Sequence, residues 1–333
     1  MSGSSNFIRS IGGASGAGRA LLLAALIVAF IAFVPNFTSS NNIYALFQTF
    51  ALLGLVTLGL SLTMISGEFD LSVGAMVAVG GLITLKMGES SALTGVLFAV
   101  SFGAVIGFLN AAIFWRLNIS SLVVTVGTMM ALSGLAYWLA DGRVVSSDNF
   151  DAGEFLDDPV FAILSVRSII TFVAFALVFA LLRYTRSGRD IIVTGSKRRV
   201  AVAAGARVGL SLGIVFCLSG ICAALAGSLL SLSLATASAQ MGANIMIQAA
   251  SAAILGGVAL AGGVGGAGGV LVGVFILATL NNGMSLLGAN AAAILLTNGL
   301  VLLAVVLADG HLVRRLLADA KDRRARQLYA SGS

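Results

Sequence analysis

Charged residues are scarce in this chain: Asp, Glu, Lys and Arg together make up 10% of its 333 residues. A soluble domain carries about 25% charged residues, so this chain has too few to cover a surface that faces water. Hydrophobic residues make up 59% of the sequence. The composition therefore excludes an ordinary soluble domain and predicts an integral membrane protein.

Histidine and cysteine are too rare to build most catalytic or metal centres. The single histidine, His311, lies in a charged tail. Cys217 and Cys222 are five residues apart in one apolar run, so on a helix they project from different sides and act as small packing residues. The sequence contains no G-x-x-x-x-G-K-[ST] loop and no H-E-x-x-H motif. We therefore expect no catalytic residue, no metal site and no cofactor in this chain.

Proline occurs only twice, whereas glycine occurs 41 times. Glycine lets membrane helices approach closely where no hydrophobic effect drives them together. The apolar runs have roughly the 18 or more residues that cross a bilayer core of about 30 Å. They lie at about 19–35, 43–66, 71–86, 92–115, 120–140, 160–183, 208–233, 244–262, 268–288 and 291–308. The predicted fold is all-α, a polytopic membrane protein with about ten transmembrane helices.

The charges lie in blocks between the apolar runs. The positive-inside rule places the basic segment 184–207 and the basic tail in the cytoplasm, and the acidic segment 141–158 outside. An even number of helices with both termini cytoplasmic satisfies this rule. We therefore interpret the pI of about 9.9 as a topology signal and expect no nucleic-acid partner. The predicted plan is an N-terminal segment 1–18, a transmembrane domain 19–308 and a C-terminal tail 309–333.

The ten predicted helices can be divided into two halves of five. Because five is odd, the second half enters the membrane from the opposite side, as in the inverted repeats that are common in transporters. Only residues 66–70 separate the second and third runs, and the third run is short and rich in glycine. A broken or re-entrant helix there is tolerated only when it is buried in protein or faces a water-filled cavity. The chargeless glycine stretch at 262–269 is too flexible to assign.

Polar residues inside or beside the apolar runs are the candidates for a substrate pathway, because polar groups in lipid must be paired or face water. Amides both donate and accept hydrogen bonds, which suits a ligand rich in hydroxyls. The alternative is that these residues hydrogen-bond helix to helix as packing contacts. No string of intramembrane acids or histidines indicates a proton relay. The candidates are Glu68, Asp70, Asn110, Thr125, Thr128, Gln248, Asn281, Asn282, Thr297 and Asn298.

The acids of segment 141–158 lack the D-x-D-x-D-G spacing of a calcium loop and are interpreted as a solvated acidic loop. Segment 184–207 contains basic residues followed by a small-residue helix at about 200–205. From the residues alone, two interpretations stay open for this segment. It is either a docking element for a partner or a basic loop that fixes orientation beside anionic lipid.

Four motifs resemble the permease subunits of ribose-type sugar ABC importers. Residues 67–74, GEFDLSVG, resemble the signature G-x-I-D-L-S-V-G, with Phe69 in place of the usual Ile. Residues 185–189, followed by Gly195 and by residues 203–205, resemble that family's coupling region. Residues 253–265, AILGGVALAGGVG, and residues 280–288, LNNGMSLLG, are similar to two further blocks. The matches follow the family's order over nearly the whole membrane region.

The resemblance implies an all-helical, type II-like ABC importer permease that pairs with a second copy, as a homodimer, around one central pathway. Separate ATPase subunits would use the ATP, and a periplasmic or lipid-anchored binding protein would deliver a monosaccharide or polyol. Residues 196–199, SKRR, depart from the family's coupling region, which often has an acidic residue there, and would suit an ATPase with a more acidic groove. The residues expected to couple the permease to the ATPase are Arg186, Gly188, Arg189, Gly195, Ala203, Ala204 and Gly205.

The expected location is a bacterial cytoplasmic membrane. A branched-chain amino acid ABC permease is the nearest alternative, because it shares part of the LS-x-G pattern, and Asp70-Leu71-Ser72-Val73-Gly74 favours sugar. A secondary carrier that works without ATP is a different class of alternative, and the lack of intramembrane acid pairs disfavours it. The sequence does not identify the sugar.

Overall fold

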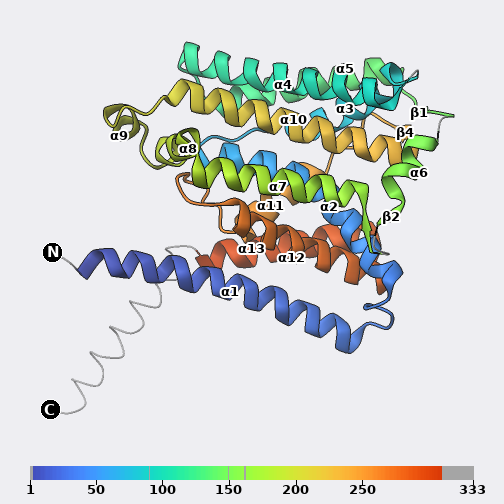
Figure 1. Ribbon diagram of the computed structural model, residues 1–333, viewed down its shortest axis with the longest axis horizontal. Helices are drawn as coiled ribbons and strands as arrows, with labels where there is room; N and C mark the ends of the chain where they lie inside the picture. The colour runs from blue at the N-terminus through green and yellow to red at the C-terminus, as the bar shows by residue number, and fades with distance from the viewer. Residues whose placement is uncertain (1–2, 90, 149, 161–162, 310–333) are drawn as a thin grey trace. The chain divides into compact units, whose positions relative to one another are not determined.

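The computed structural model describes residues 3–89, 91–148, 150–160 and 163–309 (Figure 1). Apart from residue 309, the predicted C-terminal tail with His311 lies outside the described residues. The first elements along the chain are α1 (Gly3–Phe33), α2 (Ser40–Ile65), α3 (Val73–Met87), α4 (Ala92–Leu117), α5 (Ser121–Ala140), β1 (Val145–Ser146), α6 (Asp151–Asp157), β2 (Pro159–Val160) and β3 (Leu164–Ser165). They are followed by α7 (Val166–Tyr184), α8 (Arg186–Ser196), α9 (Arg198–Ala203), α10 (Val208–Leu234), β4 (Thr236–Ala237), α11 (Ile245–Leu255), α12 (Ala267–Leu286) and α13 (Ala291–Asp309).

Seven of the described helices are long and apolar enough to cross a membrane: α1, α2, α4, α5, α7, α10 and α12. The shorter helices α3, α11 and α13 are also apolar, and together the ten coincide with the ten predicted runs. The fold is therefore an all-α, multi-pass membrane protein, as the sequence predicts. The chain falls into two units, one ending at Gly288 and one beginning at Ala289, so α13 is described by itself.

Two helices form the centre of the first unit. In α2 and α10, 56% of the most apolar 18-residue window is buried, the same share as in α12 and far more than the 6% of α1. Both central helices pack against each other. Helix α2 begins where the Ser39 hydroxyl caps it by accepting from the Asn42 backbone N–H at 3.3 Å. The site residues are positioned on, or directly beside, this central pair.

The same packing pattern occurs twice around the central pair. Helices α3 and α4 pack on each other and on α10, whereas α11 and α12 pack on each other and on α2. Glycines allow matching close approaches in the two sets. A Cβ on Gly95 of α4 would lie 3.0 Å from the Cα of Gly88, and a Cβ on Gly273 of α12 would lie 2.8 Å from the Cα of Gly256. This repetition agrees with the predicted relation between the two halves.

Two boundaries differ from the hydrophobic runs. Helix α1 begins at Gly3, within the predicted N-terminal segment. Helix α11 ends at Leu255, seven residues before its run ends, because the backbone turns at Gly257 with φ +84°. The Arg19 Nη1 of α1 donates to the Gly256 carbonyl at 3.2 Å. This cation stabilises the end of the helix, where the carbonyl dipoles are negative.

Short elements lie at the two ends of the bundle (Figure 1). Helices α8 and α9 lie at the end that we call the basic end, defined by residues 184–207. Helix α6 and the strands β1 and β4 lie at the other end, which we call the acidic end, defined by residues 141–160. There β1 pairs antiparallel with β4, and β2 pairs antiparallel with β3. The predicted acidic loop 141–158 therefore contains a short strand, β1, and a short helix, α6.

Candidate functional site

A buried carboxylate lies in the connector between α2 and α3, residues 66–72. Asp70 is 1% exposed. Its carboxylate accepts hydrogen bonds from the Ser72 backbone N–H at 3.0 Å, the Ser72 hydroxyl at 2.5 Å and the Ser219 hydroxyl of α10 at 2.8 Å. Ser72 directly precedes α3, so the carboxylate lies at the positive end of the α3 dipole. These donors offset the cost of burying a polar group.

The hydrogen bonds continue from Ser72 to two further helices. The Asn110 amide of α4 donates to the Ser72 hydroxyl at 3.3 Å, and the Thr128 hydroxyl of α5 donates to the Asn110 carbonyl oxygen at 2.6 Å. Asn110 is buried, whereas Thr128 is half-buried. We call this set the Asp70 network; its residues are Asp70, Ser72, Asn110, Thr128 and Ser219. Three predicted pathway residues are thus brought together with two serines that were not predicted.

The residues of the Asp70 network can line a substrate pathway or hold helices together as packing contacts, and their hydrogen bonds to one another bear on this choice. Both oxygens of the Asp70 carboxylate accept from the protein, and Asn110 uses both ends of its amide. Packing contacts of this kind link α10, the connector, α4 and α5. Thr128 is the member that is partly exposed and can also face a pathway. The pathway role of the set stays a prediction.

The other predicted pathway residues lie elsewhere. Asn282 of α12 exchanges two hydrogen bonds with Asn42 of α2, both at 2.9 Å. The adjacent Asn281 has a buried side-chain oxygen with no partner in the described part of the chain. Gln248 is half-buried on α11. Asn298 lies on α13, in the second unit.

Glu68 also lies apart from the Asp70 network, although only Phe69 separates it from Asp70. Its carboxylate forms an ion pair with the guanidinium of Arg198, which begins α9. The Arg198 guanidinium lies 5.5 Å from the centre of the Trp115 ring on α4. This is a cation–π distance. The structure therefore places the Glu68 side chain against the basic end.

The predicted coupling region forms two short helices, α8 and α9. Thr185 ends α7 and begins α8, because its hydroxyl accepts from the Gly188 backbone N–H at 3.0 Å. Gly188 is buried, and a Cβ there would lie 2.5 Å from the Cα of Leu182, so only glycine permits this tight corner. The predicted coupling residues Arg186, Arg189, Ala203, Ala204 and Gly205 are exposed, as docking contacts need to be.

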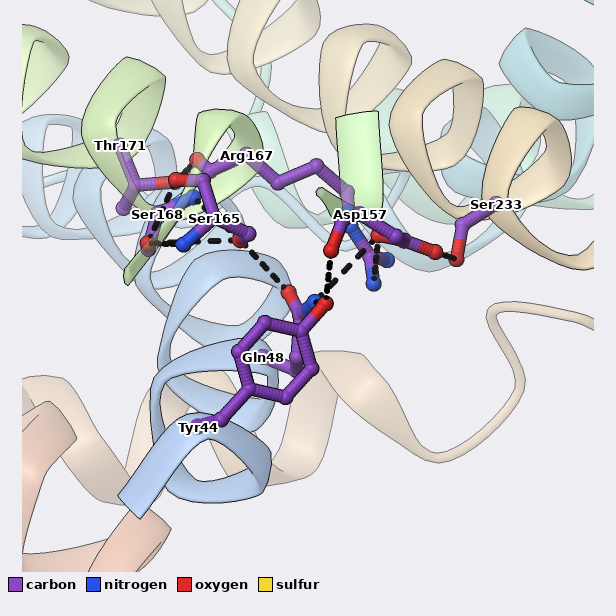
Figure 2. A network of polar contacts seen from close by, with 8 residues as sticks. All are labelled: Tyr44, Gln48, Asp157, Ser165, Arg167, Ser168, Thr171 and Ser233. Carbon is purple, nitrogen blue, oxygen red and sulfur yellow. Dashed lines mark hydrogen bonds and ion pairs between the residues drawn. The ribbon is translucent and has the colours of Figure 1, made fainter. Parts of the chain in front are cut away.

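At the acidic end, a polar cluster ties α6 to the three long helices α2, α7 and α10 (Figure 2). Asp157 of α6 forms an ion pair with Arg167 of α7 at 2.6 Å, and accepts from the Ser233 hydroxyl of α10 at 2.5 Å. The Tyr44 hydroxyl of α2 donates to the Asp157 backbone carbonyl at 2.5 Å. Gln48, also of α2, donates to the Asp157 carboxylate at 3.3 Å. We call this the acidic-end cluster.

Sequence reasoning missed the acidic-end cluster and Ser219. A signal existed for the cluster, because Arg167 is a single cation at the start of an apolar run that follows an acidic segment. Such a cation needs a partner. No signal marked Ser219, since a serine in an apolar helix usually bonds its own backbone, as Ser133 does with Met129.

Two grooves on the sides of the bundle have apolar linings. One, of about 380 Å³, lies between α7 and α10 and is lined by Leu177, Val178, Leu181, Ile214, Cys217 and Leu218. Another, of about 300 Å³, lies between α7 and α12. Their linings suit the acyl chains of lipids and offer no polar groups to a sugar.

Comparison with known proteins gives one family match and several relatives. Residues 42–308 match the family described as "branched-chain amino acid transport system / permease component". The L-arabinose transport system permease protein of Escherichia coli (strain K12) is 32% identical over 88% of this chain and 90% of its own length. The ribose import permease protein of Bacillus subtilis (strain 168) is 31% identical over 83% of this chain and 86% of its own. The D-allose transport system permease protein of Escherichia coli (strain K12) is 28% identical over 88% of this chain and 90% of its own. No solved structure matches the chain significantly.

Proposed function

The chain belongs to the family of branched-chain amino acid transport system permease components, and we propose that it is the membrane-spanning subunit of an ABC importer for a monosaccharide or related polyol. The observation that carries this proposal is the likeness, over more than four-fifths of the chain, to permeases named for L-arabinose, ribose and D-allose. The ten apolar helices supply the membrane part of such a system.

The family description names branched-chain amino acids, which is also the nearest alternative from the sequence. Sugar is the better assignment, because the relatives at 28–32% identity are named for pentoses and a hexose. The motif at residues 67–74 supports the same choice. Our proposal therefore keeps sugar as the substrate class and makes leucine the competing substrate in the test.

ATP hydrolysis would take place in separate ATPase subunits that contact α8 and α9. Two features support this part of the proposal. Helix α8 is amphipathic, with Ile191 fully buried and Arg189 exposed, and α9 carries exposed Arg198 and Arg199. The basic end would then be cytoplasmic, in agreement with the positive-inside rule. The acidic end would face outward, toward an extracytoplasmic binding protein.

The pathway would lie between two copies of the chain. Thr128 of the Asp70 network is half-buried within a single copy, and α5 carries exposed side chains on the same helix, including Leu122, Met130 and Trp138. A helix that combines a polar contact with an exposed apolar face is suited to pack against a second copy. The homodimer and the membrane lipid around it are parts of the proposal.

The test is reconstitution of the permease in proteoliposomes with its ATPase and its binding protein. We expect uptake of at least one of L-arabinose, D-ribose and D-allose that requires ATP, the ATPase and the binding protein. A matched control contains an ATPase whose phosphate-binding lysine has been replaced, and it should abolish uptake. Uptake that persists without the ATPase, or transport of leucine with none of the three sugars, would overturn the assignment.

A further inference from the structure

The connector 66–72 is the place where the basic end meets the buried Asp70 network. Glu68 points to α9 and pairs with Arg198, whereas Asp70 bonds to Ser219 of α10. The Glu68 side chain is 14% exposed and that of Arg198 is 41% exposed. The two acids are two residues apart, with only Phe69 between them, so a displacement of Glu68 by more than a few ångströms must also move Asp70.

The backbone contacts beside this ion pair leave no free space. The connector residue Gly67, Gly195 of α8, and Gly262 and Gly263 of the α11–α12 loop approach one another closely. A Cβ on Gly195 would lie 2.6 Å from the Gly263 nitrogen, and a Cβ on Gly262 would lie 2.5 Å from the Gly67 Cα. The Gly263 N–H donates to the Ile65 carbonyl at 2.8 Å. A shift of α8 toward the bundle therefore pushes directly on the connector.

Beyond the connector, the Asp70 network reaches the helices of the bundle. Asp70 contacts α10 through Ser219 and the start of α3 through Ser72, and Ser72 leads through Asn110 to Thr128 on α5. These contacts are buried apart from the half-buried Thr128, so water does not compete with most of them. The contiguous route runs from α8 and α9, through the connector, to α3, α4, α5 and α10.

We propose that Glu68 is a coupling residue and not a pathway residue: its ion pair with Arg198 transmits the movement of the coupling helices to the connector and the Asp70 network. This inference rests on the proposed function. An ion pair with a solvent-exposed partner, here Arg198 at 41%, contributes little to stability, typically about 0–1 kcal/mol for exposed pairs. If the ion pair had only a structural role, breaking it would change the ATP hydrolysed per transported sugar little. If it has a coupling role, breaking it raises the ATP hydrolysed for each sugar that is transported.

The experiment uses the whole reconstituted importer, with whichever of L-arabinose, D-ribose and D-allose the wild type takes up. Four permeases are compared: wild type, Glu68→Arg, Arg198→Glu and the double exchange. Each is assayed for sugar uptake and for ATP hydrolysis in the same proteoliposomes. We expect each single change to raise the ATP hydrolysed per sugar about 5-fold or more, the lower range of typical coupling between sites. The double exchange should restore the ratio, because it restores the ion pair.

The matched control is Arg183→Glu. Arg183 lies in the last turn of α7, outside the proposed docking helices α8 and α9, and is exposed, so this change reverses a charge beside the basic end without breaking the pair with Glu68. It tests whether a loss of positive charge toward the ATPase is itself the cause, and we expect a ratio close to that of wild type. If the reversed charge of Glu68→Arg prevents assembly of the importer, the neutral variant Glu68→Gln is measured in its place, because it also removes the ion pair with Arg198.

The outcomes separate the two levels of the proposal. A wild-type importer that takes up sugar without the ATPase, or that transports leucine and none of the three sugars, contradicts the proposed function. A wild type that transports, with Glu68→Arg and Glu68→Gln at the wild-type ratio, overturns the coupling role alone. The same conclusion follows if the double exchange is as uncoupled as the single changes, or if Arg183→Glu uncouples equally. A raised ratio in the single variants with recovery in the double exchange supports it.

Discussion

The ion pair at the acidic end should respond very differently to the loss of its acid and the loss of its base. Asp157 and Arg167 are 2.6 Å apart, and their side chains are 30% and 9% exposed respectively. Replacing Asp157 with Asn leaves the more deeply buried charge without its partner. The Arg167 Nε already has no hydrogen-bond partner in the described part of the chain. We therefore expect Asp157→Asn to be the more damaging change.

The magnitudes follow from this difference in burial. Removing one partner of a buried ion pair costs about 3–5 kcal/mol, and Arg167 is buried enough for a value near 3 kcal/mol. The change Arg167→Met leaves Asp157, which water reaches and which still accepts from Ser233 and Gln48. Screening by water lowers the cost, so we expect about 1–2 kcal/mol. The double variant should be less destabilised than the sum of the two.

The assay is thermal unfolding of the purified permease, with the four permeases measured in one detergent. For domains of about 150–250 residues, 1 kcal/mol shifts Tm by about 2–4 °C, and this longer chain should lie at the lower end of that range. Asp157→Asn should then lower Tm by about 6 °C and Arg167→Met by about 2–4 °C. Asp158 and Arg143 are exposed residues of the acidic end, and Asp158→Asn and Arg143→Met serve as controls that should leave Tm unchanged. An Arg167→Met variant less stable than Asp157→Asn, or strictly additive effects, would refute the reasoning.

Two further predictions concern the interior. Ser219→Ala removes a donor from the buried carboxylate of the connector and should destabilise the permease by about 1–3 kcal/mol; Ser133→Ala, whose hydroxyl bonds only to its own helix, should change Tm little in the same assay. Gly227→Ala would drive a Cβ into a backbone carbonyl of α3. This change should destabilise the permease by at least about 1–3 kcal/mol and reduce the amount of folded protein seen on size-exclusion chromatography. Gly127→Ala, where nothing lies within 4 Å, is its control, and equal behaviour of the two variants would contradict the packing argument.

The ten helices could be predicted because the signal for each lies within its own run. Length and hydropathy are local properties, so the membrane class follows from composition and the number of apolar helices follows from the separate apolar runs. The end of α11 could not be predicted, because it depends on contacts from a distant part of the chain. The apolar run continues past Leu255, but the helix stops where Arg19, on α1, binds the Gly256 carbonyl.

Which residues of the candidate site bond to one another could be predicted only where those residues are close in sequence; Asn110 and Thr128 were predicted as candidates but not as partners of Ser72. Asp70 and Ser72 stand in one motif and do bond to each other. Ser219 lies 149 residues further along the chain and gave no signal of its own. Glu68 was grouped with Asp70 because both acids stand at the edge of one apolar run. The fold separates their partners, since the connector passes from the basic end to the buried network within these residues.

The two ends of the bundle are linked by the same pair of central helices. Helix α2 bears Tyr44 and Gln48 at the acidic end, and the connector continues from its other end. Helix α10 bears Ser233 at the acidic end and Ser219 in the Asp70 network. A helix of 26 residues is about 39 Å long, and it tilts as a rigid body because its hydrogen bonds are internal. A push on the connector therefore reaches the acidic-end cluster without any change inside the helix. A tilt of α2 would therefore move Tyr44 and Gln48 against Asp157, to which both donate hydrogen bonds.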